Sequence, residues 1–427
     1  MADEDTRREV FLALAEVYEK QDPRNLYLTI DFTDKDQGPF LQRLIAELRA
    51  ERSVEGKLGT IRFTDQGYNK YKSEIAALRK PRKPANIVGA PRLLFLGAGA
   101  TQPLGKMLMG AFVKWLMNQS PPEQNLLESI CIEELDLEFL LEELEGLTSK
   151  SYLAEHLERS AKQLGQAGFF NIGVDLRGIL GFPVAAGKLL KWVKYQVFHH
   201  YRELILEPSY QKNFEALLDL FALPGRPLVI FTTNYDPMVE EFCRLTEAGW
   251  SLLDGFTSDP RVSEHYWERT TFEEFKISPG EKRIILFKLH GSTTWIRLGT
   301  RILKSPPMYA GDDKMCENIM IFPATRKVAI EDPFFTAYDY LEKCLGAAEL
   351  CLSIGYSFRD YDTLMRIKAA KISNPALHVC VLDPNAEKLR GTLGSNEIDA
   401  TPLPFIFGVQ TQEYMDAIRK LVGRTAG

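Results

Sequence analysis

Short apolar runs alternate with helical patterns over most of the chain, from residue 91 onward. The runs lie at residues 92–96, 228–232, 283–289, 350–354 and 378–382. Apolar residues at helical spacing between several of these runs predict helices at Pro103–Met117, Asp236–Thr246 and Tyr361–Ala370. Near-continuous apolar strands between helices are typical of a parallel sheet that is covered on both faces. The pattern therefore predicts an α/β fold with a doubly wound parallel sheet.

One long interval departs from this alternation. Residues from about 121 to 223 have helical periodicity and little strand character. We interpret this interval as a large helical insertion that follows the first strand and helix.

The first 80 residues show a different order of elements. Apolar positions predict helices at Arg7–Lys20 and Pro39–Arg52, then a short strand and a third helix at Gln66–Leu78. This order, together with the passage Ile61–Tyr68, resembles a winged-helix domain. We therefore predict a small winged-helix-like α+β domain at residues 1–80, a basic, proline-containing linker at residues 81–90, and a second domain at residues 91–427.

A winged helix often binds DNA, but the charge of this block does not favour that role. Residues 1–80 contain 14 Lys and Arg residues against 15 Asp and Glu residues. A domain that neutralises phosphates needs an excess of positive charge. We place protein contact or dimerisation slightly ahead of DNA binding for this domain.

Composition narrows the class of protein. The length of 427 residues favours two domains, and a formal net charge of −6 predicts no general attraction to nucleic acid or anionic lipid. The six cysteines form no Cys-x-x-Cys pair, which excludes a four-cysteine zinc ribbon and does not resemble a disulfide framework. No apolar run reaches the roughly 20 residues that span a bilayer. We expect a soluble, cytoplasmic protein with no membrane partner and no zinc.

Small and polar residues follow three of the predicted strands at the points where the strands end. Gly97-Ala98-Gly99 follows the first strand, Asn234 and Asp236 follow the second, and His290 follows the third. Because open parallel sheets bind ligands at the carboxyl ends of their strands, we expect these loops to share one ligand crevice.

Each of these residue types has a chemical and a structural interpretation. Glycine lets the backbone approach a phosphate, an amide can hold a water or a ribose hydroxyl, and histidine can act as a general base. The full GxGxxG pattern fails at Gln102, and a Walker A loop fails at Met107. The structural alternatives are a tight turn for the glycines, a helix cap for Asn234 or Asp236, and a backbone-bonded side chain for His290.

Two later strands also end in polar residues. Ser357 follows the strand at 350–354 and can bond a ribose or a phosphate, and Asp360 can cap the next helix. Asp383 follows the strand at 378–382 and can bind the hydroxyls of an adenosine ribose, with helix capping as an equal alternative.

Taken in order, these loops resemble the motifs of the SIR2-like, sirtuin-related domain family. The motifs are Gly97–Thr101, Thr232–Asp236, Lys288–Ser292, Gly355–Asp360 and Leu382–Asn385, and the acidic stretch Leu135–Leu141 resembles the bacterial branch of the family. The resemblance spans about residues 90–425. It implies a Rossmann-like domain that takes NAD as a substrate and cleaves the bond between nicotinamide and ribose.

The resemblance also implies roles for individual residues. Asn234 and His290 are the implied catalytic residues at the reacting ribose, and Asp236 would help to form the nicotinamide pocket. The residues implied in NAD binding are Gly97, Ala98, Gly99, Thr101, Thr233, Asp236, Gly355, Ser357 and Asp383. Asp383 stands where deacetylating members often have asparagine.

The reaction follows from a departure from the family. Deacetylating sirtuins carry a small module held by four zinc-bound cysteines, and this sequence has no such spacing. We therefore expect water as the acceptor, as in the NAD hydrolases of bacterial antiphage defence. The expected partners are a further copy of the chain and an activating protein or phage-derived trigger. The alternatives are an NAD-dependent deacylase or ADP-ribosyltransferase, or a non-catalytic NAD-sensing regulator that binds DNA.

Overall fold

The computed structural model divides the chain into two units, Met1–Pro84 and Ala85–Gly427. The structure describes residues 10–11, 14–15, 18, 28–29, 38–55, 60–79, 87–131, 137, 139–148, 176–258, 264–278, 280–306, 316–321, 331–393, 400–409 and 411–424.

The first unit packs helices around a small antiparallel sheet with the strand order β1-β3-β2. Its described elements are β1 (Leu28–Thr29), α2 (Gly38–Ala50), β2 (Val54–Glu55), β3 (Thr60–Phe63) and α3 (Asp65–Arg79). Phe11, Leu48 and Phe63 are among the buried residues of its core. The helices α2 and α3 lie close to their predicted bounds, β1 and β2 were not predicted, and the winged-helix assignment stays a prediction.

The second unit is built on a seven-stranded sheet in which every neighbouring pair of strands is parallel. The strand order is β15-β14-β13-β4-β5-β9-β6. The strands are β4 (Arg92–Leu96), β5 (Leu228–Thr232), β6 (Trp250–Leu253), β9 (Lys282–Lys288), β13 (Leu350–Ile354), β14 (His378–Leu382) and β15 (Ala400–Leu403). All five predicted strands belong to this sheet, which confirms the predicted α/β fold with a parallel sheet.

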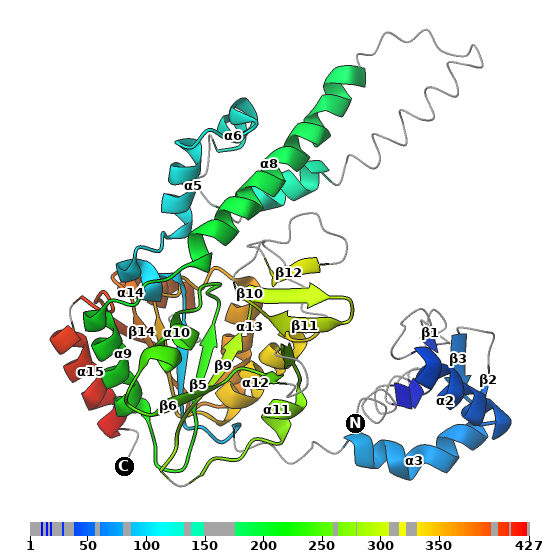
Figure 1. Ribbon diagram of the computed structural model, residues 1–427. Coiled ribbons are helices and arrows are strands. Elements are labelled where there is room, and N and C mark those ends of the chain that lie inside the picture. Colours follow the sequence, from blue (N-terminus) through cyan, green and yellow to red (C-terminus); the bar gives the residue numbers. More distant parts are fainter. Residues whose placement is uncertain are drawn as a thin grey trace. The chain divides into compact units, whose positions relative to one another are not determined.

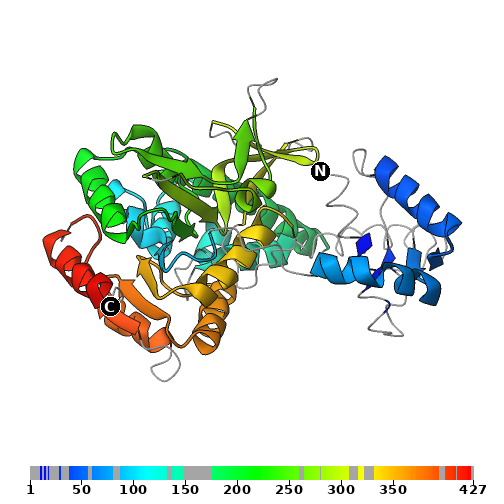
Figure 2. The same cartoon turned by 90° about the horizontal axis from the view of Figure 1, so that it is seen from below.

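Helices cover both faces of the sheet (Figures 1 and 2). On one face lie α9 (Pro208–Phe221), α10 (Met238–Leu245) and α15 (Thr411–Arg424), and on the other lie α11 (Thr270–Glu273), α12 (Phe334–Ala347), α13 (Tyr361–Ser373) and α14 (Ala386–Leu393). Successive side chains of a strand point to opposite faces. Leu93 and Phe95 of β4 therefore pack with α12, whereas Leu94 and Leu96 pack with α9.

A group of helices beyond these two layers forms the insertion, which we call the helical arm. It contains α5 (Met109–Met117), α6 (Gln124–Ile130), the helical residues 139–148 and α8 (Leu176–Arg202), which share one apolar core (Figure 1). The predicted insertion extended to residue 223, but α9 packs against the sheet, so the arm ends with α8. In the described part of the chain, no helix has the length and apolar character to cross a membrane.

The predicted helix Pro103–Met117 is wrong at its beginning. The glycine turn after β4 leads into the four-residue α4 (Ala98–Thr101) and the 3₁₀ turn η1 (Gln102–Leu104). Gly105 then adopts a left-handed conformation with φ of 81°, which ends the turn, and α5 begins only at Met109. Glycine is the residue that adopts this conformation at least cost, so the break follows from residue 105.

A second, five-stranded sheet was not predicted. Its strands pair antiparallel in the order β12-β10-β11-β8-β7. They are β7 (Phe256–Ser258), β8 (His265–Trp267), β10 (Gly291–Leu298), β11 (Arg301–Lys304) and β12 (Cys316–Met320). Because β10 begins directly after His290, this sheet borders the same edge of the parallel sheet as the predicted site.

Candidate functional site

The parallel sheet changes direction between β4 and β13. From β4 the chain adds β5, β9 and β6 on one side, and it later adds β13, β14 and β15 on the other. The connections that follow β4 and β13 therefore run to opposite faces of the sheet. Such a switch point is where open α/β sheets bind ligands.

Glycines bring these two loops into backbone contact. Gly355 has a φ of 61°, and a Cβ atom there would lie 2.3 Å from the backbone nitrogen of Ala100. A Cβ atom on Gly97 would lie 2.5 Å from the Cα atom of Tyr356, and one on Gly99 would lie 2.7 Å from the Cα atom of Gly355. All three positions therefore require glycine for packing, whatever they do for a ligand.

The same contacts use the backbone amides that were expected to face a pyrophosphate. Gly97 N donates to Ile354 O at 2.9 Å, and Gly99 N donates to Gly355 O at 2.8 Å. Gly97 and Gly99 also lie behind the pocket wall rather than on it, whereas Ala98 and Gly355 line the pocket. The glycine turn thus shapes the crevice, and its two flanking amides are already bonded within the protein.

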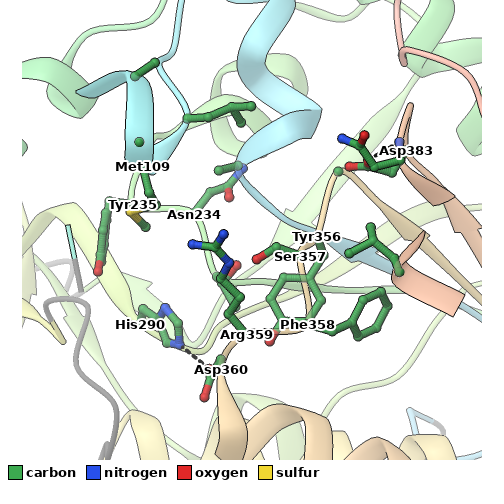
Figure 3. Close-up of a pocket in the computed structure, with 18 of the residues that line it drawn as sticks. Met109, Asn234, Tyr235, His290, Tyr356, Ser357, Phe358, Arg359, Asp360 and Asp383 are labelled. Carbon is green, nitrogen blue, oxygen red and sulfur yellow. Dashed lines mark hydrogen bonds and ion pairs between the residues drawn. The ribbon is translucent and has the colours of Figure 1, made fainter. Parts of the chain in front are cut away.

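A pocket of about 770 Å³ opens at this switch point. Of the residues predicted from the sequence, it brings together Ala98, Thr233, Asn234, His290, Gly355, Ser357 and Asp383. Figure 3 shows Asn234, Ser357, Arg359 and His290 around one space, with Asp383 farther along the pocket. A volume of this size is within the usual range for small-molecule sites, about 300–1,000 Å³.

Asn234 is held from two sides in the pocket wall. Its backbone nitrogen donates to Thr232 Oγ1 at 3.0 Å, and its side-chain Nδ2 donates to Gly97 O at 3.1 Å. Within the described residues, no protein donor reaches its Oδ1 atom. The side chain is 8% exposed, so the amide can present this oxygen to a bound water or hydroxyl in a fixed direction.

His290 contacts a carboxylate from the other half of the sheet. Its Nε2 atom lies 2.8 Å from Oδ2 of Asp360, and both side chains are buried. In Figure 3 the two side chains point toward each other below Asn234. A histidine whose second nitrogen is bonded to a carboxylate is suited to general-base work because its ring has a defined tautomer.

Two predicted residues, Thr101 and Asp236, lie beneath the pocket rather than on its wall. Thr101 Oγ1 donates to Asp236 Oδ2 at 3.0 Å, and Asp236 Oδ1 accepts from Met238 N at 3.2 Å. Burial raises the pKa of Asp236, while Lys288 and Thr101 act in the opposite direction. The carboxylate therefore braces the loop that carries Asn234, and its place in a nicotinamide pocket stays a prediction.

Lys288 supports the same loop from below. Its Nζ atom donates to Asp236 O at 2.6 Å and lies 3.2 Å from Glu240 Oε1. Lys288 is 2% exposed, and a buried ammonium group requires such partners. The pairing of a strand lysine with the loop after the neighbouring strand is not visible in the sequence.

Several pocket residues were not predicted. Tyr235 and Asp360 lie in two of the SIR2-like motifs, but only a capping role was predicted for Asp360. The helical arm contributes Met109 and Tyr201 to the pocket. Basic side chains also line the pocket, namely Lys114, Arg359 and Lys388. The spacing of Arg359 and Asp360 after Ser357 was the available signal, whereas Lys114 and Tyr201 come from helices whose packing the sequence does not show.

The helical arm is tied to the pocket by the loop between η1 and α5. Lys106 Nζ donates to His200 O at 2.6 Å and also bonds Glu203 O, and burial lowers the pKa of Lys106. Met107 N donates to His200 Nε2 at 2.9 Å, and Tyr201 OH donates to Met107 O at 2.8 Å. The end of α8 therefore sets the position of the pocket wall at Leu108 and Met109.

No metal site accompanies this pocket in the described part of the chain. No group of three or more His, Cys, Asp or Glu side chains among the described residues is arranged to hold a metal ion.

Comparison with known proteins finds one family model that matches part of the chain. The model of the SIR2-like domain matches residues 228–400. No curated protein matches the chain. Similar solved structures include a Sir2 homologue in complex with NAD, at 12% identity over 80% of this chain and 93% of that chain, with a TM-score of 0.38. Another is Sir2 bound to an acetylated peptide, at 10% identity over 81% and 98%, with a TM-score of 0.37.

The matched segment contains the strands β5, β9, β13 and β14 together with Asn234, His290, Asp360 and Asp383. The strand β4 and the glycine turn after it precede the matched segment in the sequence. In the sheet, β4 lies between two strands of that segment, because it pairs with both β5 and β13. The resemblance inferred from the motifs is therefore confirmed over this segment. Residues 228–400 of this chain match the model of the SIR2-like domain.

Proposed function

We propose that the second unit binds NAD in the switch-point pocket and hydrolyses the bond between nicotinamide and ribose. The observation that carries this proposal is that Asn234 and His290, 56 residues apart in the segment that matches the SIR2-like domain, line one pocket with Ala98 of the turn after β4. The pocket also suits the charge of the dinucleotide. Arg359, Lys114 and Lys388 can meet a diphosphate, and Ser357 and Asp383 can meet ribose hydroxyls.

The proposed reaction needs one water and no other reactant. The C1′–N1 bond of NAD breaks and its electron pair leaves with nicotinamide, while the oxygen of water forms the new C1′–O bond. The proton of that water passes to His290 and then to solvent, so the products are nicotinamide, ADP-ribose and one proton. Asn234 Oδ1 would orient the water, and a general base typically contributes a factor of about 10²–10⁴ to the rate.

The test uses the purified full chain incubated with NAD. We expect nicotinamide and ADP-ribose to form in equal amounts, without any acylated peptide, and we expect Asn234→Ala and His290→Ala proteins to form neither. Release of nicotinamide only with an acylated peptide, or labelled ADP-ribose attached to protein, would instead support the deacylase or the transferase. Binding of NAD without any release of nicotinamide would contradict hydrolysis. Release of nicotinamide at equal rates by the wild type and both variants would contradict hydrolysis at this site.

In this proposal the enzyme depletes cellular NAD as a regulated effector of antiphage defence. The support is the resemblance of its motifs and its acidic stretch to the bacterial branch of the family. Cells that express the wild-type chain should lose NAD after phage infection, whereas cells that express Asn234→Ala should keep it. Equal NAD levels in the two strains after infection would argue against a depleting effector.

A further inference from the structure

His290 and Asp360 form a buried pair across 70 residues of sequence, and their side chains are 6% and 5% exposed. A carboxylate that has lost most of its water requires hydrogen-bond donors. The imidazole nitrogen 2.8 Å from Asp360 Oδ2 is therefore the one that bears a proton, which is Nε2. In the neutral ring this leaves the lone pair on Nδ1, on the other side of the imidazole from the contact.

The carboxylate of Asp360 is held independently of His290. Asp360 is the N-cap of α13, and its Oδ2 atom accepts from Thr363 Oγ1 at 2.9 Å, while Thr363 N lies 3.5 Å from Oδ1. The amino-terminal end of a helix of 13 residues also favours negative charge. Capping thus fixes the position of the group that meets the histidine, and the end of the helix favours a negative charge there.

The loop that leads to Asp360 is strained and anchored. Phe358 has a φ of 56°, an uncommon conformation for a residue with a side chain, and it is 1% exposed. Its ring packs edge-on against Tyr356, with centroids 4.9 Å apart. Buried aromatic packing therefore holds a turn that presents Ser357 to the pocket and directs Asp360 toward His290 (Figure 3).

The histidine is fixed by its own backbone. His290 O accepts from Ile321 N at 2.9 Å. Gly291 has a φ of 79°, and a Cβ atom there would lie 2.0 Å from Ile319 O. The glycine after the histidine is required because β12 passes this close, so the approach of the imidazole to Asp360 is set by the second sheet.

We propose that Asp360 is the positioning residue of the site. Its carboxylate holds His290 in the Nε2–H tautomer, so that Nδ1 receives the proton of the attacking water. The substrate in this statement rests on the proposed function, but the tautomer does not depend on any reaction. A simple capping residue would stabilise α13 without determining which nitrogen of His290 carries hydrogen.

The structure provides a matched control for capping. Asp332 lies one residue before Pro333, the N-cap of α12, and its carboxylate also binds the first turn of a helix. Its Oδ1 atom accepts from Thr336 N at 3.0 Å and from Thr336 Oγ1 at 2.5 Å. The substitutions Asp360→Asn and Asp332→Asn each replace a carboxylate that accepts from the first turn of a helix by an amide. Only the first changes the partner of a histidine.

The deciding experiment is long-range ¹H–¹⁵N NMR of the imidazole rings in the purified full chain, with the His290 signals assigned from a His290→Gln protein. We expect the Nε2–H tautomer in the wild type and in Asp332→Asn, and a shift toward a mixture of tautomers in Asp360→Asn, because an amide can donate as well as accept. An Nδ1–H ring in the wild type, or the same tautomer population in Asp360→Asn, would overturn the inference.

Kinetics supply a second readout. Asp360→Asn should lower kcat for nicotinamide release at least about tenfold, because fewer molecules would hold His290 in the tautomer that acts as the general base. The KM for NAD should change little. Asp332→Asn should leave both constants unchanged for the folded protein. Equal losses of kcat in the two variants would show that Asp360 acts only by stabilising its helix. If no protein hydrolyses NAD, the proposed function fails, while the NMR result still decides the role of Asp360.

Discussion

Asn234 donates its side-chain Nδ2 to the backbone carbonyl of Gly97, with the two atoms 3.1 Å apart. The bond connects the loop after β5 with the loop after β4, which are neighbours in the sheet. It also decides which end of the amide is available to a ligand. The donor is used inside the protein, so the acceptor Oδ1 faces the pocket, where the proposed reaction needs an acceptor for water.

Replacement of Asn234 by alanine should therefore greatly reduce the rate of NAD hydrolysis and only slightly reduce the free energy of unfolding. We expect NAD hydrolysis to fall about 10²-fold or more, because a water that is not oriented cannot pass its proton to a general base, whose contribution is about 10²–10⁴-fold. The free energy of unfolding should fall by only about 1 kcal/mol, the usual contribution of one hydrogen bond. Nicotinamide release and urea denaturation measure the two quantities.

Asn213 offers the matched control, because its Nδ2 also donates to a glycine carbonyl, that of Gly408 at 3.4 Å, and neither residue lines the pocket. The Asn213→Ala protein should lose a similar amount of stability and keep its turnover. Wild-type turnover in Asn234→Ala would remove this residue from the mechanism.

Replacement of Gly355 by alanine should destabilise the folded protein strongly, for two separate reasons. A left-handed conformation costs an L-residue about 1–2 kcal/mol, and Gly355 has a φ of 61°. In addition, the new Cβ atom would lie 2.3 Å from Ala100 N, and overpacking of this kind typically adds about 1–3 kcal/mol. Urea denaturation of Gly355→Ala should show the sum.

Gly225 separates the two contributions. It has a φ of 68°, and a Cβ atom there meets nothing within 4 Å. Gly225→Ala should show the conformational cost alone and keep nicotinamide release unchanged. If the two variants lost equal stability, the close approach of the loops after β4 and β13 would not be a packing constraint.

The sequence predicted the centre of the sheet better than its edges. Strands β4, β5, β13 and β14 are buried on both faces, so their residues form continuous apolar runs. The edge strands β6 and β15 are only partly buried, and β15 contains Pro402, which an edge position tolerates. Partial burial removes the apolar pattern, and this is why both strands were missed.

The second sheet left a signal that was not used. The strands β10 and β11 form a hairpin in which Leu298 pairs with Arg301, so Gly299 and Thr300 make a two-residue turn. Glycine at the first position of such a turn is a known hairpin signal. The pairing of β8 with β11 left none, because strands distant in sequence pair through geometry that local patterns do not contain.

Within the candidate site, residue type was easier to predict than partnership. The positions of Asn234 and His290 followed from their places after apolar strands. The contact between His290 and Asp360 depends on the spacing of β9 and β13 across two intervening strands, β5 and β4. The exclusion of Thr101 and Asp236 from the pocket depends on side-chain direction below the loops, which no sequence spacing specifies.

Asp383 should determine the preference for NAD over NADP. It lines the pocket half-buried, its Oδ1 atom accepts from Asn385 N at 2.8 Å, and burial raises its pKa. Its carboxylate can accept from an adenosine ribose hydroxyl and would repel a 2′-phosphate in the same place. Asp383→Asn should lower kcat/KM for NAD about tenfold, the loss of one charged hydrogen bond, and should raise the ratio of NADP to NAD turnover.

Glu387 is the control for charge at this end of the pocket. It lies exposed in the first turn of α14 and does not line the pocket. Glu387→Gln removes one negative charge and should leave the NADP to NAD ratio unchanged. A ratio that moves equally in both variants would indicate a general field rather than a contact with Asp383.

His200 should make the stability of the protein depend on pH, through its contact with the loop that connects the helical arm to the pocket. Burial, with a smaller contribution from Lys106, lowers the pKa of His200 from 6.5 to about 4. Its Nε2 atom accepts from Met107 N, which requires the neutral ring. Between these two pH values the unfolded chain binds a proton that the folded chain excludes, so stability is complete above pH 6.5 and falls as the pH drops toward 4.

The measurement compares the free energy of unfolding of the wild type and of His200→Gln across this range. Titration of carboxylates affects both proteins, so the difference isolates residue 200. One proton corresponds to at most about 1.4 kcal/mol per pH unit, and we expect less because solvent screens a half-buried ring. The advantage of the wild type should shrink as the pH falls, while the same substitution at the exposed His265 reports the effect of replacing any histidine. A wild-type advantage that stays constant from pH 6.5 to 4 would show that the folded protein accepts a proton at His200 as readily as the unfolded chain.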